Sequence, residues 1–259
     1  MSASSLGKSV RLKRIFSHPS NRILSVAIDH LMNYPIGMPE GLRNLPQTID
    51  KIAEGRPSAI TMNKGSALHC MVKHAGKVPF IVQQIAVRAD ESCFIDHAGV
   101  EEVVAMGADA IAVSIVIKGK DEARQIRHLA QVVREAEQYG LPVIPHIYPL
   151  GFEEKSGPTV SNSAEDVFYS VRIGIEMGVD LIKVPFTGDA KSFGDIVRMC
   201  PVPIVTAGGP KCNTLDEAIA MIKEVVKSGA AGSTVGRNVW GFPNIPDAIG
   251  RLKQAMFAD

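Results

Sequence analysis

"GVDLIKV", residues 178–184, carries the pattern that decides the fold: a glycine ends a helical stretch and a short apolar run begins at once. The same joint recurs as "GADAIAV" at 107–113 and as "GAAGSTV" at 229–235. These recurrences have no constant period, so they do not indicate a solenoid. They indicate one architecture in which helices and strands alternate.

Eight short apolar runs are predicted to be strands, and each is followed by a turn and a longer amphipathic stretch. The predicted strands are 23–29, 58–63, 78–84, 108–115, 141–148, 179–186, 202–209 and 232–238. The predicted helices lie near 46–54, 65–75, 97–107, 121–139, 163–178, 191–199, 213–228 and 245–257. Eight βα units in roughly 250 residues favour a parallel (β/α)8 TIM barrel. An open, doubly wound sheet is the main alternative.

Composition and charge exclude several classes of protein. The chain has 259 residues with 28 basic and 27 acidic side chains, so no global field attracts nucleic acid or anionic lipid. No apolar stretch approaches the length of a membrane span. The four cysteines are widely spaced without a C-x-x-C pair, so neither a disulfide framework nor a cysteine zinc site is expected. We expect a cytoplasmic protein.

No linker or change of composition divides the chain, so we predict a single TIM-barrel domain over 1–259 with an N-terminal extension at 1–20. The opening "MSASSLGKSVRLKRIF" is basic and lacks an apolar segment after its charges. We expect it to be a solvated, partly ordered tail rather than a targeting or nucleic-acid arm.

Lys183 interrupts the apolar run at 179–186. Side chains alternate along a strand, so if Lys183 points into the barrel, Leu181 and Pro185 share its face and their neighbours face the helices. A buried ammonium is costly, and its usual relief is a lowered pKa. A neutral amine can attack a ketone to form a Schiff base. An equally weighted alternative is that Lys183 is a structural lysine, which either forms a salt bridge or extends its amine to the rim of the barrel.

Polar residues end two other predicted strands. Asp29 could hold Lys183 in place, aid proton transfer or bind a substrate hydroxyl, and its alternative role is to cap the following turn. Tyr148 could transfer a proton near a lysine-bound intermediate, although a tyrosine before a proline is more often a packing residue. Alternation places His146 on the same face, unless Pro145 shifts the pattern.

Two glycine-rich turns, "TAGGPK" at 206–211 and "VGRN" at 235–238, follow the seventh and eighth strands, where barrels often bind phosphate. Glycine lets backbone amides approach an anion closely, and Arg237 can bind two phosphate oxygens. We therefore predict a phosphate site that contains Arg237 and three glycines: Gly208, Gly209 and Gly236.

Two weaker candidates concern ligands. Lys64, after the second strand, could meet a second anionic group, although a loop lysine is usually solvated. A zinc site built from Asp29, His30 and His146 is an alternative with few ligands, because zinc sites need a fuller histidine set. We therefore predict no metal.

With these residues in place, the sequence resembles the archaeal-type class I fructose-bisphosphate aldolase family, within the wider group of Schiff-base aldolases. The resemblance covers nearly the whole chain and is carried by "AIDH" (27–30), "IYPLG" (147–151), "DLIKVPFTGD" (180–189), "CPVPIVTAGGPK" (200–211) and "GAAGSTVGRNVW" (229–240). It implies a (β/α)8 barrel in which Lys183 forms the imine, Tyr148 transfers protons and Asp29 lies beside the lysine. The phosphate of a dihydroxyacetone phosphate moiety would be bound by Gly208, Gly209, Gly236 and Arg237.

The resemblance further implies that the protein needs no cofactor, forms homo-oligomers, often decamers, and cleaves or forms a carbon–carbon bond in a phosphorylated ketose such as fructose 1,6-bisphosphate. Several relatives carry an aromatic or small residue at the position of His146. They also read "YPRG" where this chain reads "YPLG" at 148–151, so a basic contact at the second-phosphate end is missing. The loop "HLMNYPIGMPEGLRN" (30–44) differs as well. These departures leave other phosphorylated keto-sugars open.

Two alternatives use the same scaffold. One is a related lysine-dependent thiolase or transaldol-type ketose synthase, and the other is a sugar-phosphate-binding barrel without catalysis. The thiolase branch lacks a tyrosine at the position of Tyr148, so this residue favours aldol chemistry.

Overall fold

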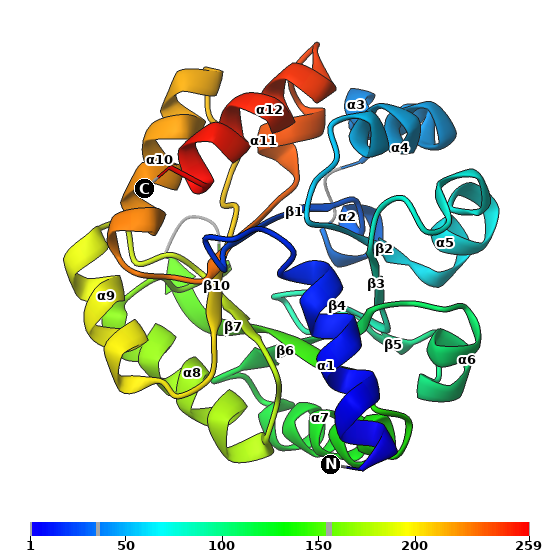
Figure 1. The fold of residues 1–259 in the computed structure, drawn as a ribbon. Coiled ribbons are helices and arrows are strands. Elements are labelled where there is room, and N and C mark those ends of the chain that lie inside the picture. Colours follow the sequence, from blue (N-terminus) through cyan, green and yellow to red (C-terminus); the bar gives the residue numbers. More distant parts are fainter. Residues whose placement is uncertain (1, 35–36, 154–156, 259) are drawn as a thin grey trace.

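The computed structural model describes residues 2–34, 37–153 and 157–258. Eight parallel strands pair in a closed ring, in which β6 bonds to β7 and β11 bonds to β1. The fold is the predicted TIM barrel, viewed along its axis in Figure 1. In ring order the strands are β1 (Ile23–Ala27), β2 (Ala59–Asn63), β3 (Phe80–Gln83), β6 (Ala110–Ile117), β7 (Val143–Glu153), β9 (Ile182–Val184), β10 (Ile204–Ala207) and β11 (Gly232–Val235).

The helices surround this ring, as Figure 1 shows. Each predicted helix is present: α4 (Leu45–Glu54), α5 (Lys64–Cys70), α6 (Val100–Ala105), α7 (Glu122–Tyr139), α8 (Ala164–Met177), α9 (Ala190–Met199), α10 (Leu215–Lys227) and α12 (Ile245–Met256). Side chains cap five of these eight helices, for example at Thr214, whose hydroxyl accepts from the amide of Glu217. Shorter helices are α2 (His30–Asn33), α3 (Glu40–Arg43), η1 (Val72–His74) and α11 (Arg237–Trp240).

Strand alternation divides the core into two layers, as predicted for β9. Ile182 and Val184 belong to the cluster between strands and helices, whereas Leu181 belongs to a cluster inside the barrel. Above this apolar interior cluster, the inward positions of seven strands are buried and polar: Ser25, Thr61, Gln83, Ser114, His146, Lys183 and Thr234. The apolar floor therefore supports a polar layer that contains Lys183.

The expectation of a solvated N-terminal tail is wrong, because residues Ala3–Ile15 form helix α1. In Figure 1 this helix lies across the near end of the barrel. Its partners precede three different strands: Lys8 pairs with Asp180 at 3.1 Å, Arg11 donates to the Gly140 carbonyl at 3.0 Å, and Arg14 pairs with Asp109 at 3.3 Å. Ile15 is fully buried in the interior cluster, so α1 closes the amino end of the barrel.

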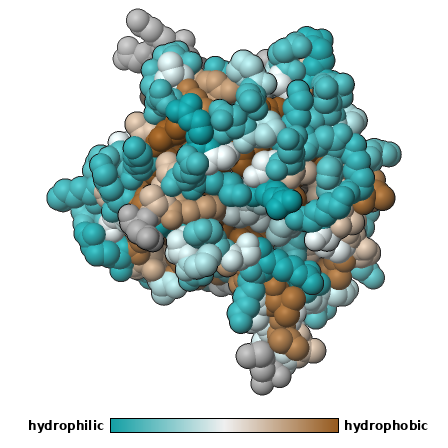
Figure 2. All heavy atoms as spheres, turned by 45° about the horizontal axis from the view of Figure 1, so that its top comes forward, coloured by the Kyte–Doolittle hydropathy of each residue, from teal (hydrophilic) through white to brown (hydrophobic). Residues whose placement is uncertain are grey.

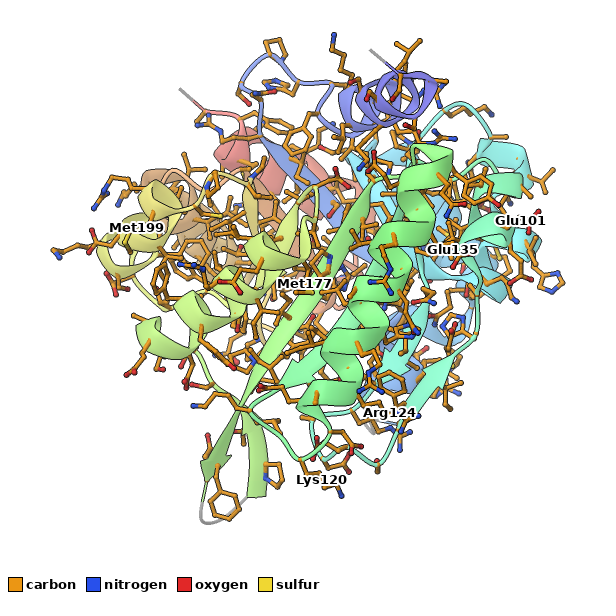
Figure 3. All side chains as sticks on the ribbon, turned by 90° about the horizontal axis from the view of Figure 1, so that it is seen from below. Glu101, Lys120, Arg124, Glu135, Met177 and Met199 are labelled. Carbon is orange, nitrogen blue, oxygen red and sulfur yellow. The ribbon has the colours of Figure 1, made fainter. Side chains whose placement is uncertain are left out.

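Two hairpins at the opposite end were not predicted. β4 (Ile85–Val87) pairs with β5 (Phe94–Asp96), and the long strand β7 folds back onto β8 (Gly157–Val160). Figure 3 shows the β7–β8 hairpin projecting from the barrel, below the helices α7 and α8 that pack beside β7. Both hairpins extend the carboxyl ends of the strands, where a barrel's active site forms.

The surface face in Figure 2 is largely hydrophilic, with hydrophobic side chains showing in scattered patches. Within the described residues, no helix is both long enough and apolar enough to cross a membrane.

Candidate active site

Lys183 lies in the middle of β9, 5% exposed, and lines a narrow cavity of about 30 Å3 at the carboxyl end of the barrel. A wider pocket of about 640 Å3 adjoins this cavity. The two share five lining residues: Tyr34, Tyr148, Ala207, Gly209 and Arg237. A ligand in the wider pocket can therefore extend one end to the lysine.

Burial lowers the pKa of Lys183 to about 8, although the negative charge of Asp29 opposes this effect. An amine with such a pKa is about one-tenth neutral at pH 7, several hundred times more than an ordinary lysine. The apolar layer and the cavity thus supply a nucleophilic amine without a general base.

Asp29 follows β1 and is 5% exposed in the same cavity. It occupies the N-cap position of α2, but its side chain accepts no capping hydrogen bond. The carboxylate is therefore not engaged in the turn, and it acts on the charge of Lys183 instead.

His30, which the sequence suggested only as part of an alternative zinc site, also lines the cavity. Its Nδ1 lies 3.6 Å from Asp29 Oδ1, and burial lowers its pKa to about 4. The imidazole is therefore neutral at pH 7. Its ring packs against Tyr34 and Trp240. A Cβ at Gly236 would come within 2.3 Å of this ring, so glycine is required there.

Tyr148 and His146 keep the predicted alternation despite Pro145, because the pairing of β7 with β6 continues unbroken from Ser114–His146 to Val116–Tyr148. Burial raises the pKa of Tyr148 well above its usual value, and neighbouring Tyr34 adds to this shift. Tyr148 therefore stays a protonated phenol at neutral pH.

His146 is buried beside Lys183, its pairing partner on β9. Burial first, and then the lysine charge, lowers the pKa of His146 well below its usual value. A neutral imidazole beside the amine does not compete with it for a proton.

The two glycine turns come together, as the phosphate prediction requires. The Gly208 amide donates to the Thr234 carbonyl at 2.8 Å, and Arg237 Nη2 donates to the Gly209 carbonyl at 2.8 Å. A Cβ at Gly208 would lie 2.8 Å from Val235 Cα, and Gly209 has a φ of +65°. Only glycine suits this close approach of the two loops.

Asn238 fastens the two turns to each other. Its Nδ2 donates to the carbonyls of Gly208 and Pro210, each at 2.9 Å, and its Oδ1 accepts from the Cys212 amide at 2.7 Å. The Arg237 Nε is buried without a hydrogen-bond partner among the described residues. The guanidinium therefore keeps a free donor at the edge of the cavity.

Lys64 is not brought to this site. It pairs with both oxygens of Glu102, at 3.1 and 3.2 Å, and lies outside the described lining of the cavity. The residues of the alternative zinc site are not arranged as metal ligands. Within the described ranges, no group of three or more His, Cys, Asp or Glu side chains is placed to hold an ion.

Tyr34 and Asn33 are further lining residues that the sequence did not predict. Tyr34 belongs to the loop after β1, where neither strand nor helix periodicity applies. Its ring lies 5.5 Å from the Arg237 guanidinium, and its hydroxyl interacts with that of Tyr148.

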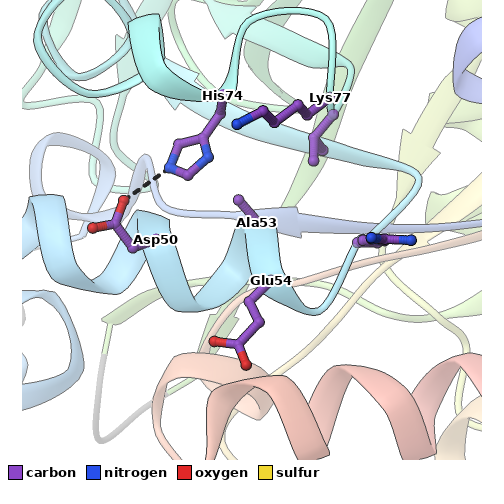
Figure 4. Close-up of a pocket in the computed structure, with 7 residues that line it drawn as sticks. Asp50, Ala53, Glu54, His74 and Lys77 are labelled. Carbon is purple, nitrogen blue, oxygen red and sulfur yellow. Dashed lines mark hydrogen bonds and ion pairs between the residues drawn. The ribbon is translucent and has the colours of Figure 1, made fainter.

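A separate cleft of about 550 Å3 lies between α4 and the segment before β3 (Figure 4). His74 Nε2 and Asp50 Oδ1 are 2.8 Å apart there, and Asp50 also pairs with Lys73 at 2.6 Å. The cleft includes none of the residues that surround Lys183.

A closed (β/α)8 barrel with a buried amine at the carboxyl end is the arrangement of a class I aldolase. The family model of the DeoC/LacD family aldolases matches residues 23–241, which include all eight barrel strands and the site. The chain belongs to the DeoC/LacD aldolase family, and the resemblance seen in its motifs is confirmed.

Two named relatives align with much of the chain. The class 1 fructose-bisphosphate aldolase of Thermoproteus tenax is 34% identical over 64% of this chain and 63% of its own. The 2-amino-4,5-dihydroxy-6-oxo-7-(phosphonooxy)heptanoate synthase of Streptomyces griseus is 28% identical over 92% of this chain and 85% of its own. Both are aldolase-family relatives with different named activities.

Solved structures agree with this placement. An archaeal fructose-1,6-bisphosphate aldolase, with its catalytic lysine covalently bound to the carbinolamine intermediate, superposes with a TM-score of 0.84. It is 26% identical, over 97% of this chain and the whole of that one.

Proposed function

We propose that the protein cleaves or forms a carbon–carbon bond in a phosphorylated ketose, with dihydroxyacetone phosphate as the half bound to Lys183. The observation that carries the proposal is the buried Lys183 amine, whose pKa of about 8 makes it nucleophilic at neutral pH. The glycine turns and Arg237 lie in the same cavity and suit the phosphate of this half.

In cleavage, the Lys183 amine attacks the ketone carbon, and the carbinolamine loses water to give a protonated imine. Asp29, the carboxylate in the cavity, takes the proton of the C4 hydroxyl as the C3–C4 bond breaks. The electron pair of that bond passes to the imine nitrogen, so an enamine remains and an aldehyde leaves. Tyr148, which is protonated, donates its proton to the enamine carbon and regains one from the protonated Asp29, so both residues return to their starting states. Water then hydrolyses the imine.

Trapping the imine tests this function. Borohydride with dihydroxyacetone phosphate should reduce the imine to a stable adduct, which mass spectrometry of peptides should locate on Lys183. Lys183→Met should give no adduct, whereas Lys191→Met, which removes a lysine 90% exposed on α9, should give the adduct as the wild type does. Absence of an adduct on Lys183 would reject the imine mechanism.

A synthase is the second candidate. The Streptomyces griseus relative is named for a product that carries a phosphonooxy group at one end and a carboxylate at the other. Leu150 stands where several relatives carry arginine, so the second end of the ligand meets a different environment here. Comparing cleavage of fructose 1,6-bisphosphate with condensation of dihydroxyacetone phosphate and a set of aldehydes separates the two candidates.

A further inference from the structure

A second pocket, of about 270 Å3, also adjoins the catalytic cavity. It shares Asn33, Tyr34 and Tyr148 with the cavity. Its remaining walls come from Val87 at the end of β4 and the three residues that follow it, from Ser114 and Val116 on β6, and from Pro158 and Val160 on β8. The pocket is therefore continuous with the site of the proposed reaction.

The position of this pocket in the ring suits the second half of the substrate. The glycine turns follow β10 and β11, the seventh and eighth strands of the ring, whereas β3 and β6 are the third and fourth. In a ring of eight strands these pairs lie opposite each other. A ketose whose phosphate lies at Arg237 and whose ketone meets Lys183 would extend its far end toward this pocket.

Arg88 is the cation in the described lining of the pocket. Its Nε donates to the Met32 carbonyl at 3.2 Å, which orients the guanidinium. The Val87 amide donates to Asn33 Oδ1, also at 3.2 Å, and ties the β4 segment to the loop that carries Tyr34. Within the described chain, no hydrogen bond or ion pair engages the Nη atoms of Arg88. They are free to bind a ligand oxygen.

Asp90 is the opposing charge, since it lines the same pocket and is exposed. One of its oxygens, Oδ1, accepts from both the amide and the hydroxyl of Ser92, at 3.0 and 2.7 Å. These hydrogen bonds from Ser92 lower the pKa of Asp90, and the charge of Arg88 adds a smaller effect, but the two charged groups form no direct ion pair. Asp90 should therefore weaken, without preventing, the binding of an anion at Arg88.

We propose that Arg88 binds a phosphate or carboxylate at the far end of the acceptor aldehyde, so that the complete substrate is anionic at both ends. Arg88 supplies, from the β4 segment, the cation that Leu150 does not supply from β7. This inference rests on the proposed aldolase function and adds the class of acceptor to it.

Two matched pairs of acceptors test the inference with dihydroxyacetone phosphate as the donor: glyceraldehyde 3-phosphate against glyceraldehyde, and succinic semialdehyde against butyraldehyde. The wild type should prefer the anionic member of at least one pair. Arg88→Gln should lower kcat/KM for that member by about tenfold to a hundredfold, mainly through KM, as expected for a lost charge-assisted contact. Its kcat/KM for the neutral member should stay within about twofold.

Two control variants separate binding from folding and from net charge. Arg124→Gln removes an arginine that packs 4.4 Å from the Phe94 ring at the same end of the barrel (Figure 3) and outside the pocket, so it should leave both ratios unchanged. Asp90→Asn should act in the opposite direction to Arg88→Gln and lower KM for the anionic acceptor. The comparison of acceptors in the wild type needs no variant to fold.

Equal use of anionic and neutral acceptors by the wild type would overturn the inference and leave the proposed aldol reaction standing. If the imine forms on Lys183 but no acceptor reacts, the inference is also overturned, because the pocket is then not an acceptor site. An unchanged anionic preference in Arg88→Gln would also overturn it. If the proposed function itself is wrong, the result differs from these outcomes, because no adduct then forms on Lys183.

Discussion

The surroundings of Lys183 have two opposing effects on the pKa of its amine, and their balance determines its reactivity. Burial favours the neutral form, whereas Asp29 favours the charged form, and the resulting pKa is about 8. Adduct formation with dihydroxyacetone phosphate should therefore rise as the pH increases through about 8 and level off above it. The rate of trapping by cyanoborohydride, measured across this range, provides the check.

Asp29→Asn should shift this profile to lower pH, because it removes the charge that raises the pKa of Lys183. The shift distinguishes an electrostatic role of Asp29 from a purely structural one. A midpoint that stays near that of the wild type would count against the pairing of these two residues.

The cost of burying Lys183 predicts an effect on stability. In the unfolded chain this amine is protonated below about 10.5, but in the fold only below about 8, so the destabilisation is complete below pH 8 and disappears as the pH rises through 10.5. Lys183→Met should raise the free energy of unfolding at pH 7 by up to about 3 kcal/mol. Urea denaturation at pH 7 and pH 10 should show a smaller increase in the free energy of unfolding at the higher pH. The control, Lys191→Met, should show no such increase at either pH.

Tyr148→Phe tests the proton transfer. The variant should still form the borohydride-trapped adduct, because Lys183 keeps its environment, while turnover falls by about 10²–10⁴-fold. Turnover close to that of the wild type would instead favour acyl-transfer chemistry, for which the tyrosine is not needed.

The sequence was sufficient to predict those site residues whose positions follow from strand periodicity. Alternation placed Lys183 inside the barrel, and it placed Tyr148 and His146 on one face. It could not reach Tyr34 or Arg88, because both lie in connections where side-chain direction depends on tertiary contacts rather than on a repeat.

Among the elements, α1 shows how tertiary contacts decide the structure of a polar segment. It contains little apolar surface, and only Ile15 is fully buried. The helix is held by ion pairs and a carbonyl contact to segments that precede three strands. No local pattern in 1–16 could reveal partners that are more than ninety residues away.

Ile15→Ala should lower the free energy of unfolding by about 2–5 kcal/mol, because it leaves a cavity in the barrel floor. Leu6→Ala, at a side chain 56% exposed on the same helix, should change it by less than about 0.5 kcal/mol. Chemical denaturation measures both, and equal effects would show that α1 does not contribute through its contact with the floor.

The two hairpins were missed for a different reason. The segments 85–96 and 150–160 lack clear alternation, although each hairpin pairs strands that are close neighbours in the sequence. The eight helices and eight strands were predicted because their patterns are local, and several of the helices also begin at a capping residue.

For the molecule as a whole, the resemblance to the aldolases predicts a homo-oligomer. We expect a native mass that is an integral multiple, at least twofold, of the 27.8 kDa chain. Light scattering coupled to size-exclusion chromatography measures this mass directly, and a monomer over the whole working concentration range would contradict the prediction.

The closed floor of the barrel has a kinetic consequence. Because α1 and the apolar layer seal the amino end, every molecule must enter and leave through the carboxyl end, past Tyr34 and Tyr148. In the proposed reaction, the ketone half would occupy the closed end of this passage and the acceptor its entrance. Steady-state kinetics of the proposed reaction should therefore be sequential and ordered: the ketone donor binds before the acceptor in synthesis, and the aldehyde departs before the ketone in cleavage.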